Sequence, residues 1–408
     1  MRDFKEARLI DITIGNGTYG IAAPAVPKDN NKYTYLRITD INDDGSLNFS
    51  DLKSVDDPKA NKYLLKPNDI VFARTGNSTG RSYFYDGSAG ELVYAGFLIK
   101  FSLDSHKVNP KILKYYTHSK NYYDWVASFD SGATRGNINA KTFAEMPITL
   151  PPRNIQDKIV AILSALDEKI ETNRKINARL EELAQALFKS WFIDFEPFGG
   201  QMPEDWKIVK MSEVIEDIAA GPFGSKLPKA CFTSEGTPII DGANLKERIV
   251  DETFSKFVSP SKSNELGRAV AHRNDFVVTI SGTIGQIAYI YGTSKFSDYL
   301  VSQRQFRFSL KKDKVNKHYI SLLFANNIGK QKILSFGNQV GVPALSQPLK
   351  NFKNVEIILP GMIIQNSFGE IIESIDSLIC KNKQESARLT EMRDTLLPKL
   401  MSGELIPE

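Results

Sequence analysis

The most regular pattern of apolar positions in this chain lies between residues 155 and 190. Seam positions recur there at alternating spacings of four and three residues, the period of a helix that packs along one stripe against another helix. A helix over residues 155–190 would be about 54 Å long, more than a domain of about 150 residues needs for its own core. We therefore expect a paired helix, with the seam residues Ile155, Ile159, Ile162, Leu166, Asn173, Leu180, Leu183 and Leu187.

A second helix of the same kind is expected near the end of the sequence. From Leu150-Pro151 onward the chain matches itself at an offset of 209 residues without a gap, which gives the second seam as Ile364, Ile371, Ile375, Asn382, Leu389 and Leu396. Asn173 and Asn382 fall at the same position, and a polar residue in an apolar seam fixes register and orientation at a cost in stability. We expect the two helices to pair antiparallel; the alternative is that each packs only on its own domain.

Ahead of each helix the pattern changes to short apolar runs bounded by Gly and Asn, which is typical of β-strands. Asp69–Ala73 and Asp275–Ile280 are such runs, and helical stretches are expected near 111–127 and 316–334. The two halves again correspond. Asn68-Asp-Ile-Val matches Asn274-Asp-Phe-Val at an offset of 206, and Gly17-Thr-Tyr-Gly matches Gly221-Pro-Phe-Gly at 204. A slowly growing offset indicates a duplicated unit with small loop insertions.

The predicted fold class is α+β: two tandem domains of mixed α/β structure, each followed by a long helix, with the helices forming an antiparallel coiled coil about a pseudo-twofold axis. The second domain opens at Trp206, and because the first has no such Trp, we expect its N-terminal edge to be shorter or differently built. The expected boundaries are residues 1–152, the helix 153–193, a linker rich in Pro and Gly at 194–206, residues 207–360 and the helix 361–402.

Composition limits the function without deciding it. The net charge of +4 over 408 residues permits nucleic-acid binding but does not require it. Only Cys231 and Cys380 are present, which argues against a disulfide framework. The start at Met1 lacks an apolar signal segment, and no run approaches the roughly 20 apolar residues of a membrane helix, so we expect a cytoplasmic protein.

Signatures of catalysis are missing from the sequence. The four histidines are scattered singly, so we expect no metal site. The segment Gly76–Gly80 resembles a phosphate loop, but its glycines are one residue too close and Arg81 stands where Lys belongs. We therefore expect the chain to have no catalytic activity and to bind no cofactor of its own.

Polar loops at equivalent points of both halves are the candidate binding residues. Arg, Asn and Gln can bond to guanine and adenine edges, and Ser and Thr suit phosphates, although the loops could equally be solvated turns. Gln303 and Arg304 could also form the wet face of a strand with Phe306 and Phe308. The candidates are Arg74, Thr75, Asn77, Ser78, Thr79, Arg81, Thr134, Arg135 and Asn137 in the first half, and Ser281, Thr283, Gln286, Gln303, Arg304, Asn338 and Gln339 in the second.

The aromatic cluster between Tyr115 and Trp125 could stack on extruded bases, but its helical spacing favours packing in the core. We assign Tyr115, Tyr116, Tyr122, Tyr123 and Trp125 to the core.

Nearly the whole chain resembles the specificity subunits of Type I restriction-modification systems. The last of the strings that carry the resemblance is the most specific. They are Lys66-Pro-Asn-Asp-Ile-Val-Phe-Ala, Met146-Pro-Ile-Thr-Leu-Pro-Pro, Ile155-Gln-Asp-Lys-Ile-Val and Leu389-Thr-Glu-Met-Arg-Asp-Thr-Leu-Leu-Pro-Lys-Leu-Met-Ser-Gly-Glu-Leu.

The resemblance implies that residues 1–152 and 207–360 are target-recognition domains that each read one half of a bipartite, asymmetric DNA site. It also implies partners: two methyltransferase subunits that use S-adenosylmethionine to methylate adenine, and two restriction subunits driven by ATP and magnesium. The methyltransferase would dock on the helices, with Arg174, Lys175, Glu181 and Glu182 at the rim. The alternatives are a duplicated protein-binding scaffold with a coiled-coil spacer, and the specificity subunit of a related system that cuts on both sides of its site.

Overall fold

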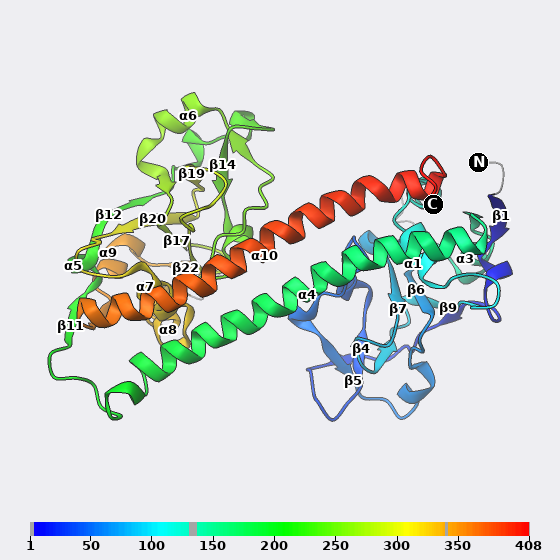
Figure 1. The fold of residues 1–408 in the computed structure, drawn as a ribbon, viewed down its shortest axis with the longest axis horizontal. Coiled ribbons are helices and arrows are strands. Elements are labelled where there is room, and N and C mark those ends of the chain that lie inside the picture. The colour runs from blue at the N-terminus through cyan, green and yellow to red at the C-terminus, as the bar shows by residue number, and fades with distance from the viewer. Residues whose placement is uncertain (1–3, 130–136, 339–341, 408) are drawn as a thin grey trace. The chain divides into compact units, whose positions relative to one another are not determined.

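The computed structural model describes residues 4–129, 137–338 and 342–407. The chain divides into two compact units, of which unit 1 comprises Met1–Asn173 and Gln384–Glu408, and unit 2 comprises Arg174–Lys383. Figure 1 shows that each unit joins a globular part to halves of two long helices, α4 (Arg153–Phe192) and α10 (Met362–Ser402). Each helix thus contributes one half to each unit, because the division falls near the middle of both.

Over residues 4–129 and 137–152, the globular part of unit 1 contains two four-stranded sheets and three short α-helices. The sheet that contains β6 (Asp69–Ala73) is mainly buried, and Phe72 of β6 stacks on Phe143 with ring centroids 4.7 Å apart. A separate antiparallel pair, β1 (Lys5–Arg8) with β10 (Pro147–Leu150), leads into α4. The sheets are ordered β2 (Thr18–Tyr19), β9 (Leu98–Ser102), β6 (Asp69–Ala73), β7 (Ser82–Tyr85), and β3 (Ala25–Val26), β5 (Lys53–Val55), β4 (Thr34–Leu36), β8 (Leu92–Tyr94); the helices are α1 (Lys111–Tyr116), α2 (Lys120–Ala127) and α3 (Ala140–Ala144).

The globular part of unit 2 repeats this plan. Its first sheet is ordered β12 (Ile215–Ala220), β20 (Gln305–Leu310), β17 (Phe276–Thr279), β18 (Ile287–Tyr289), and its second β13 (Phe232–Thr233), β15 (Phe257–Val258), β14 (Thr237–Ile240), β19 (Asp298–Val301), β16 (Val270–His272). Two strand pairs complete the unit: β11 (Lys207–Lys210) with β23 (Glu356–Leu359), and β21 (Gly337–Asn338) with β22 (Ala344–Leu345). Its short helices are α5 (Met211–Val214), α6 (Pro260–Glu265), α7 (Lys317–Ala325), α8 (Asn327–Leu334) and α9 (Pro348–Lys353). The helical stretches expected near 111–127 and 316–334 are confirmed.

The repeated Asn-Asp pair has the same structural role in both units. Asn68 and Asn274 both have a φ of 74°, a left-handed conformation that Asn tolerates better than most residues. The following Asp69 and Asp275 accept a hydrogen bond from the backbone N–H three residues earlier, at 2.8 and 2.9 Å. The motif therefore closes the tight turn that leads into β6 and β17.

The match of Gly17–Gly20 to Gly221–Gly224 is wrong by three residues. The N–H of Gly20 donates to the carbonyl of Leu98, and the N–H of Gly221 donates to Gln305, at 3.2 and 2.8 Å. Leu98 and Gln305 are equivalent, since they pair with Ala73 and Thr279 at the ends of β6 and β17. Gly20 therefore corresponds to Gly221. The sequence comparison was shifted by three residues because both loops contain two glycines at the same spacing.

The N-terminal edges of the two units are built alike, contrary to the sequence-based expectation. Lys5 pairs with Leu150 as Lys207 pairs with Leu359, so Phe4 takes the place of Trp206. Trp206 itself is buried and packs on Phe192 and Phe198, with ring centroids 5.7 and 5.1 Å away. The end of the expected linker is therefore packed into unit 2.

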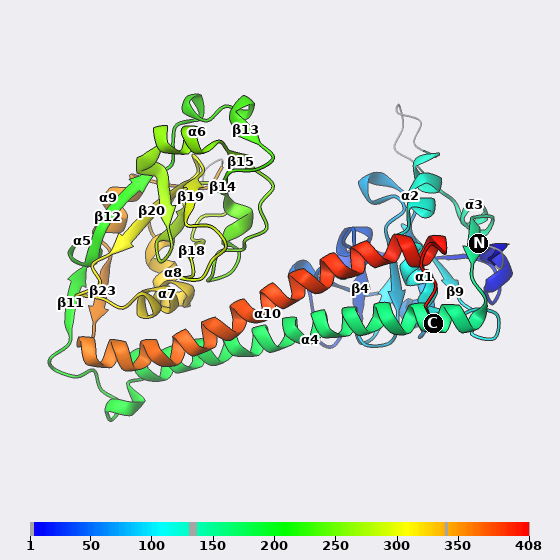
Figure 2. The ribbon, with the colours of Figure 1, turned by 45° about the horizontal axis from the view of Figure 1, so that its top comes forward.

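Within each unit the two helix halves run antiparallel (Figure 2). In unit 1, Leu163 of α4 shares an apolar cluster with Leu397 and Leu400 of α10, while ten residues further along α4 Asn173 donates a hydrogen bond to Glu385 at 2.8 Å. In unit 2, the side chains of Asn177 and Asn382 bond at 2.8 Å, and Phe188 contacts Phe368 with ring centroids 6.2 Å apart. The contacting residues of α10 thus have lower residue numbers as the residue number along α4 increases, which is the order expected for antiparallel helices.

The seam predicted from the sequence is displaced by one residue at three positions. Ile162, Leu183 and Ile371 are exposed, and their immediate C-terminal neighbours Leu163, Ala184 and Ile372 are buried. The physical reason is that each half-helix packs on a globular domain as well as on the other helix, so its buried face is wider than a coiled-coil seam. Of the other seam residues, Ile159, Asn173, Ile375 and Asn382 are buried, and Ile155, Leu166, Leu180, Leu187, Ile364, Leu389 and Leu396 are partly buried.

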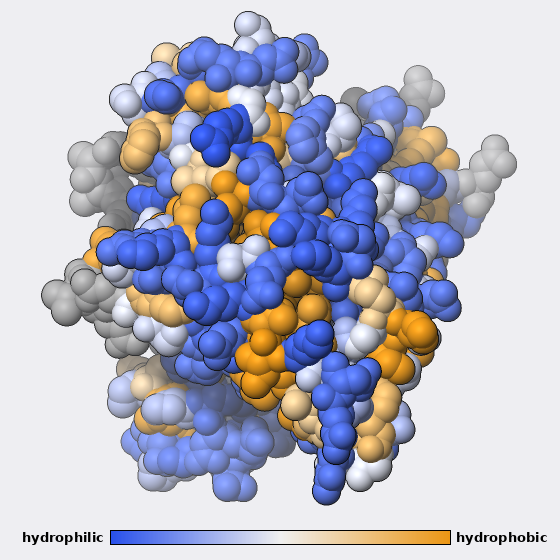
Figure 3. All heavy atoms as spheres, turned by 90° about the vertical axis from the view of Figure 1, so that its left-hand side faces the viewer, coloured by the Kyte–Doolittle hydropathy of each residue, from blue (hydrophilic) through white to orange (hydrophobic). Residues whose placement is uncertain are grey.

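The surface is polar on the face shown in Figure 3, where apolar residues form separate patches between hydrophilic ones. Among the described residues, no helix combines the length and the hydropathy that crossing a membrane requires.

Candidate nucleic-acid interface

The structure brings the two candidate loops of each unit together. In unit 1, Thr75, which follows β6, forms an antiparallel bridge with Asn137. In unit 2, Ser281, which follows β17, forms the same bridge with Ala344. The first loop of each unit leaves the end of a buried central strand, which fixes its base. Each unit therefore has one surface built from two loops far apart in the sequence.

Several candidates in the first loop of unit 1 are engaged within their own domain. Arg81 donates from Nε to Asp43 at 2.6 Å and from Nη1 to the carbonyl of Ile41 at 3.1 Å. Ser78 is buried, and Thr79 donates to the carbonyl of Gly76 at 2.8 Å. These three side chains shape the loop, and Asn77, which directly precedes them, is exposed.

Arg74 lies at the base of this loop, with its guanidinium carbon 5.1 Å from the centre of the Tyr19 ring. It forms an ion pair with none of the described residues, and its half-buried side chain is held in place by the aromatic face. The guanidinium of Arg74 is therefore a cation that the Tyr19 ring holds at a fixed place at the base of the loop.

In the second loop of unit 1, Thr134 and Arg135 lie outside the described residues, and Asn137 is exposed. In unit 2, Gln339 lies outside the described residues, and Asn338 belongs to β21. Ser281 is partly buried and Thr283 is exposed, whereas Gln286 accepts a hydrogen bond from the buried Thr279 at 3.1 Å. Thr283 is thus the most accessible of these candidates in unit 2.

Gln303 and Arg304 are not part of a strand. They are exposed at the two central positions of a tight turn, in which the N–H of Gln305 donates to the carbonyl of Ser302 at 3.0 Å. The N–H of Ile280 donates to the carbonyl of Arg304 at 2.7 Å, which joins this turn to the first loop. The alternative of a strand with one wet face is therefore wrong for Gln303 and Arg304, because the strand begins only at Gln305.

Three exposed basic side chains lie in this turn and in the segment that follows Gly224. Lys226, Lys229 and Arg304 are exposed, and none of them pairs with an acidic side chain in the part of the chain that the structure describes. Unpaired cations of this kind are available to phosphate groups, in contrast to Arg81. Sequence reasoning missed the two lysines, since two isolated lysines in a loop carry no pattern.

The aromatic side chains expected in the core lie there with one exception. Tyr115, Tyr116 and Tyr122 are buried and Trp125 packs against the same cluster, whereas Tyr123 is half exposed.

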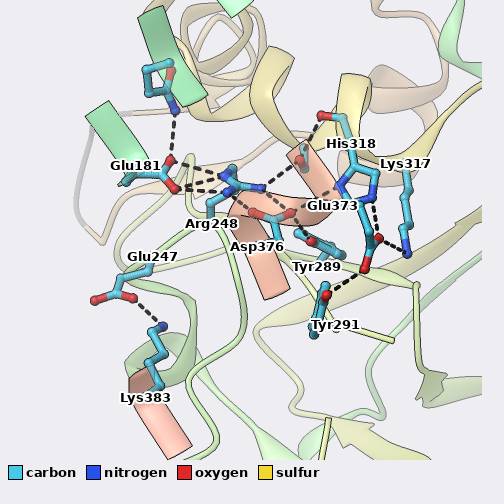
Figure 4. A network of polar contacts seen from close by, with 12 residues as sticks. Glu181, Glu247, Arg248, Tyr289, Tyr291, Lys317, His318, Glu373, Asp376 and Lys383 are labelled. Atoms are coloured by element: carbon cyan, nitrogen blue, oxygen red, sulfur yellow. Dashed lines mark hydrogen bonds and ion pairs between the residues drawn. The ribbon is translucent and has the colours of Figure 1, made fainter. Parts of the chain in front are cut away.

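A buried ionic network anchors the globular part of unit 2 to both helices (Figure 4). Arg248 is almost fully buried and donates to Asp376 of α10, from Nη1 at 3.1 Å and also from Nη2. Its Nε donates to Glu181 of α4 at 3.1 Å. His318 of α7 lies 3.1 Å from Asp376, and Tyr289 donates to the same carboxylate.

The network determines the charge state of its members. Burial alone would raise the pKa of Asp376, but the Arg248 guanidinium and the hydrogen bonds from His318 and Tyr289 hold that pKa well below its usual value. Burial would likewise lower the pKa of Arg248, yet Asp376 raises it above its usual value. Both groups are therefore charged, and the pair fixes the domain on its helices.

Asp167 of α4 is the counterpart of Asp376 in unit 1. It accepts hydrogen bonds from Lys114 at 2.6 Å, Tyr115 at 3.1 Å and Arg393 of α10 at 3.1 Å. Burial would raise the pKa of Asp167, but the charges of Lys114 and Arg393 lower it. Each unit thus joins its globular part to the helices through one aspartate, which is partly buried in unit 1 and fully buried in unit 2. Sequence reasoning missed both sites, since their partners are far away in the chain.

Comparison with protein families gives one match that occurs twice. Residues 1–182 and 203–391 each match the family described as the Type I restriction modification DNA specificity domain. The chain is 24% identical to the Type I restriction enzyme HindI specificity subunit of Haemophilus influenzae over 92% of both chains. It is also 24% identical to the MjaIX specificity subunit of Methanocaldococcus jannaschii, over 72% of this chain and 68% of the relative.

The fold is similar to a solved structure. The crystal structure of the Type I restriction-modification S subunit from M. genitalium superposes with a TM-score of 0.59 at 16% identity, covering 99% of this chain and 96% of that one. The likeness confirms the predicted fold class.

Proposed function

Since the chain belongs to the Type I restriction modification DNA specificity domain family and is a DNA specificity subunit, we propose that each unit reads one half of a two-part DNA site. Residues 1–152 and 207–360 are the proposed target-recognition domains. The observation that carries the proposal is the duplicated surface, in which two loops meet at the bridges Thr75–Asn137 and Ser281–Ala344.

The two halves of the site would be unrelated in sequence. The fold is duplicated, yet the side chains on the two surfaces differ: unit 1 presents Arg74 and Asn77, whereas unit 2 presents Thr283, Gln303 and Arg304. Because different side chains read different base edges, an asymmetric site is the expected result. Between the halves would lie a gap of unread base pairs, with a length set by the helices.

The chemistry is assigned to partner subunits. Two methyltransferase subunits with S-adenosylmethionine would methylate adenine, and two restriction subunits with ATP and magnesium would cut. The helices are the proposed methyltransferase dock, and the proposed rim needs one revision: Glu181 is bound to Arg248 and Gln185 inside unit 2. Glu182, Arg174 and Lys175 are exposed. The DNA substrate fits a cytoplasmic location.

The test is a methylome. The chain is expressed with its methyltransferase subunit in a host that lacks DNA methylation, and methyladenine is mapped by long-read sequencing. The expected result is one two-part motif with a fixed gap. A soluble, assembled complex that leaves the DNA unmethylated and binds no DNA at low salt would contradict the proposal and favour a protein-binding scaffold.

A further inference from the structure

The two most exposed aromatic side chains among the described residues are Phe223, 82% exposed, and Phe97, 58% exposed. Single exposed apolar residues are common on protein surfaces and carry no meaning by themselves. These two, however, lie at the same corner of the duplicated fold, one in each unit.

The corner is a tight turn that precedes β9 in unit 1 and β20 in unit 2. The N–H of Leu98 donates to the carbonyl of Ala95 at 2.8 Å, as that of Gln305 does to Ser302 at 3.0 Å. The carbonyl of the third turn residue, Phe97 or Arg304, accepts a hydrogen bond from the first loop, from Arg74 at 3.1 Å and Ile280 at 2.7 Å. We call residues 95–98 and 302–305 the corner turns.

The segment that leaves β2 or β12 crosses directly over each corner turn. A Cβ on Gly20 would lie 2.3 Å from the carbonyl oxygen of Ala95, and one on Gly221 only 1.9 Å from that of Ser302. A Cβ on Gly224 would lie 2.6 Å from Oε1 of Gln303. Glycine is therefore required at positions 20 and 221, where the added atom would meet backbone, and the approach of Gly224 to Gln303 places Phe223 beside the corner turn.

The two aromatic residues come from different segments of the corner. Phe97 lies in the corner turn itself, at the position of Arg304, whereas Phe223 lies in the crossing segment. Each is accompanied by a cation without an acidic partner among the described residues: Arg74 in unit 1 and Arg304 in unit 2. Both units thus combine an exposed ring with a cation next to the candidate loops.

We propose that Phe97 and Phe223 are DNA-contacting residues, whose rings pack against a base step in the half-site that their own unit reads. The inference rests on the proposed function and adds a contact to it. An apolar ring gains nothing from phosphates but can wedge against a base step or cover a thymine methyl group. The neighbouring arginine would then hold the adjoining phosphate.

The test compares the assembled methyltransferase complex carrying Phe97→Ala or Phe223→Ala with the unsubstituted complex. Matched controls are Phe49→Ala in unit 1 and Ile208→Ala in unit 2, which remove side chains 55% and 65% exposed at other places. We expect Phe223→Ala to weaken specific binding about tenfold, in the range of one base–aromatic stacking contact, and the controls to leave it unchanged.

The methylome gives a second readout of the same variants. Phe97→Ala should relax the base preference in one half of the motif and Phe223→Ala in the other. Variants that bind and methylate like the controls, or that both affect the same half, would overturn the inference. Failure of the unsubstituted complex to bind DNA would instead overturn the proposed function.

Photocrosslinking keeps the inference testable if an alanine variant fails to assemble. A benzophenone-containing phenylalanine analogue should crosslink to one half of the site when it stands at position 97 and to the other half when it stands at position 223. The same analogue at position 49 should not crosslink to DNA. Assembled complexes without a crosslink to DNA at either position would overturn the inference.

Discussion

At the scale of single residues, the structure separates arginines that bond inside the fold from arginines that pair with no acidic side chain among the described residues. Arg81 bonds to Asp43 and to the carbonyl of Ile41, so its charge is used inside unit 1. Arg304 is exposed on the corner turn and pairs with no acidic side chain within the described part of the chain. The sequence did not distinguish the two arginines, because the type of a residue does not reveal which side chains it bonds in the folded protein.

Substituting these two arginines should therefore have different effects. We expect Arg304→Ala to lower DNA affinity and to reduce the slope of log affinity against log salt by about 1, the loss of one phosphate contact. Arg81→Ala should instead lower the stability of unit 1 by at most about 1 kcal/mol, since the pair with Asp43 is open to solvent. Salt titrations of DNA binding and thermal denaturation check the pair; equal effects on DNA affinity would contradict the distinction.

Arg248 should be far more sensitive than any surface arginine. Arg248→Met leaves Asp376 buried without its main counter-charge, and we expect a loss of about 3–5 kcal/mol of stability in unit 2. The double variant Arg248→Met with Asp376→Leu removes both charges and should regain most of that loss. Urea denaturation measures both, and a double variant no more stable than the single one would argue against the buried pair as the cause.

The same network predicts the sign of a pH effect. The pKa of Asp376 is lower in the folded protein than in the unfolded chain, where it is about 4, so its contribution to stability is complete above that pH and is lost as the pH falls further. In Arg248→Met, burial should raise the pKa of Asp376, so that unit 2 loses stability as the pH rises instead. Denaturation curves between pH 3 and about 8 distinguish the two signs.

At the scale of elements, each long helix has a wider buried face than a coiled-coil seam. Ile162 was predicted to lie in the seam and is 37% exposed, whereas its neighbour Leu163 is fully buried. Leu163 packs in the cluster that joins the core of unit 1 to Leu397 and Leu400 of α10. The helix therefore serves both as a partner of the other helix and as part of the domain core.

This difference gives a matched pair of adjacent substitutions. Leu163→Asp places a charge in the core and should destabilise unit 1 by about 3 kcal/mol or more. Ile162→Asp should change its stability little, since the carboxylate is hydrated. Urea denaturation of the two variants decides between the registers, and the opposite order of stabilities would restore the seam inferred from the sequence.

At the scale of the whole molecule, duplication is the feature that relates the sequence to the function. The two units share strand order around the central strands β6 and β17, loops joined by an equivalent bridge, and an aspartate, Asp167 or Asp376, that bonds each globular part to the helices. Their surface side chains nevertheless differ. A shared frame with different surfaces is what the proposed reading of two unrelated half-sites requires.

Salt dependence is the prediction that belongs to the whole molecule. If both units contact phosphates, the affinity for DNA should fall steeply between 50 and about 200 mM salt, by about 10³-fold for six contacts. Deleting Lys226 and Lys229 side chains by alanine substitution should flatten that slope. An affinity for DNA that is independent of salt would contradict the phosphate contacts, whereas no binding even at low salt would favour the scaffold.

The sequence by itself determined the duplication, the long paired helices, the central strands and the family. These follow from local patterns: apolar periodicity, the Asn-Asp turn and the constant offset from Leu150 onward. Only the tertiary structure decided which face of each helix is buried, that Arg81 is engaged, and that Phe97 and Phe223 share a corner. Those properties depend on contacts between residues far apart in the chain, such as Arg248 with Asp376, and spacing along the sequence does not encode them.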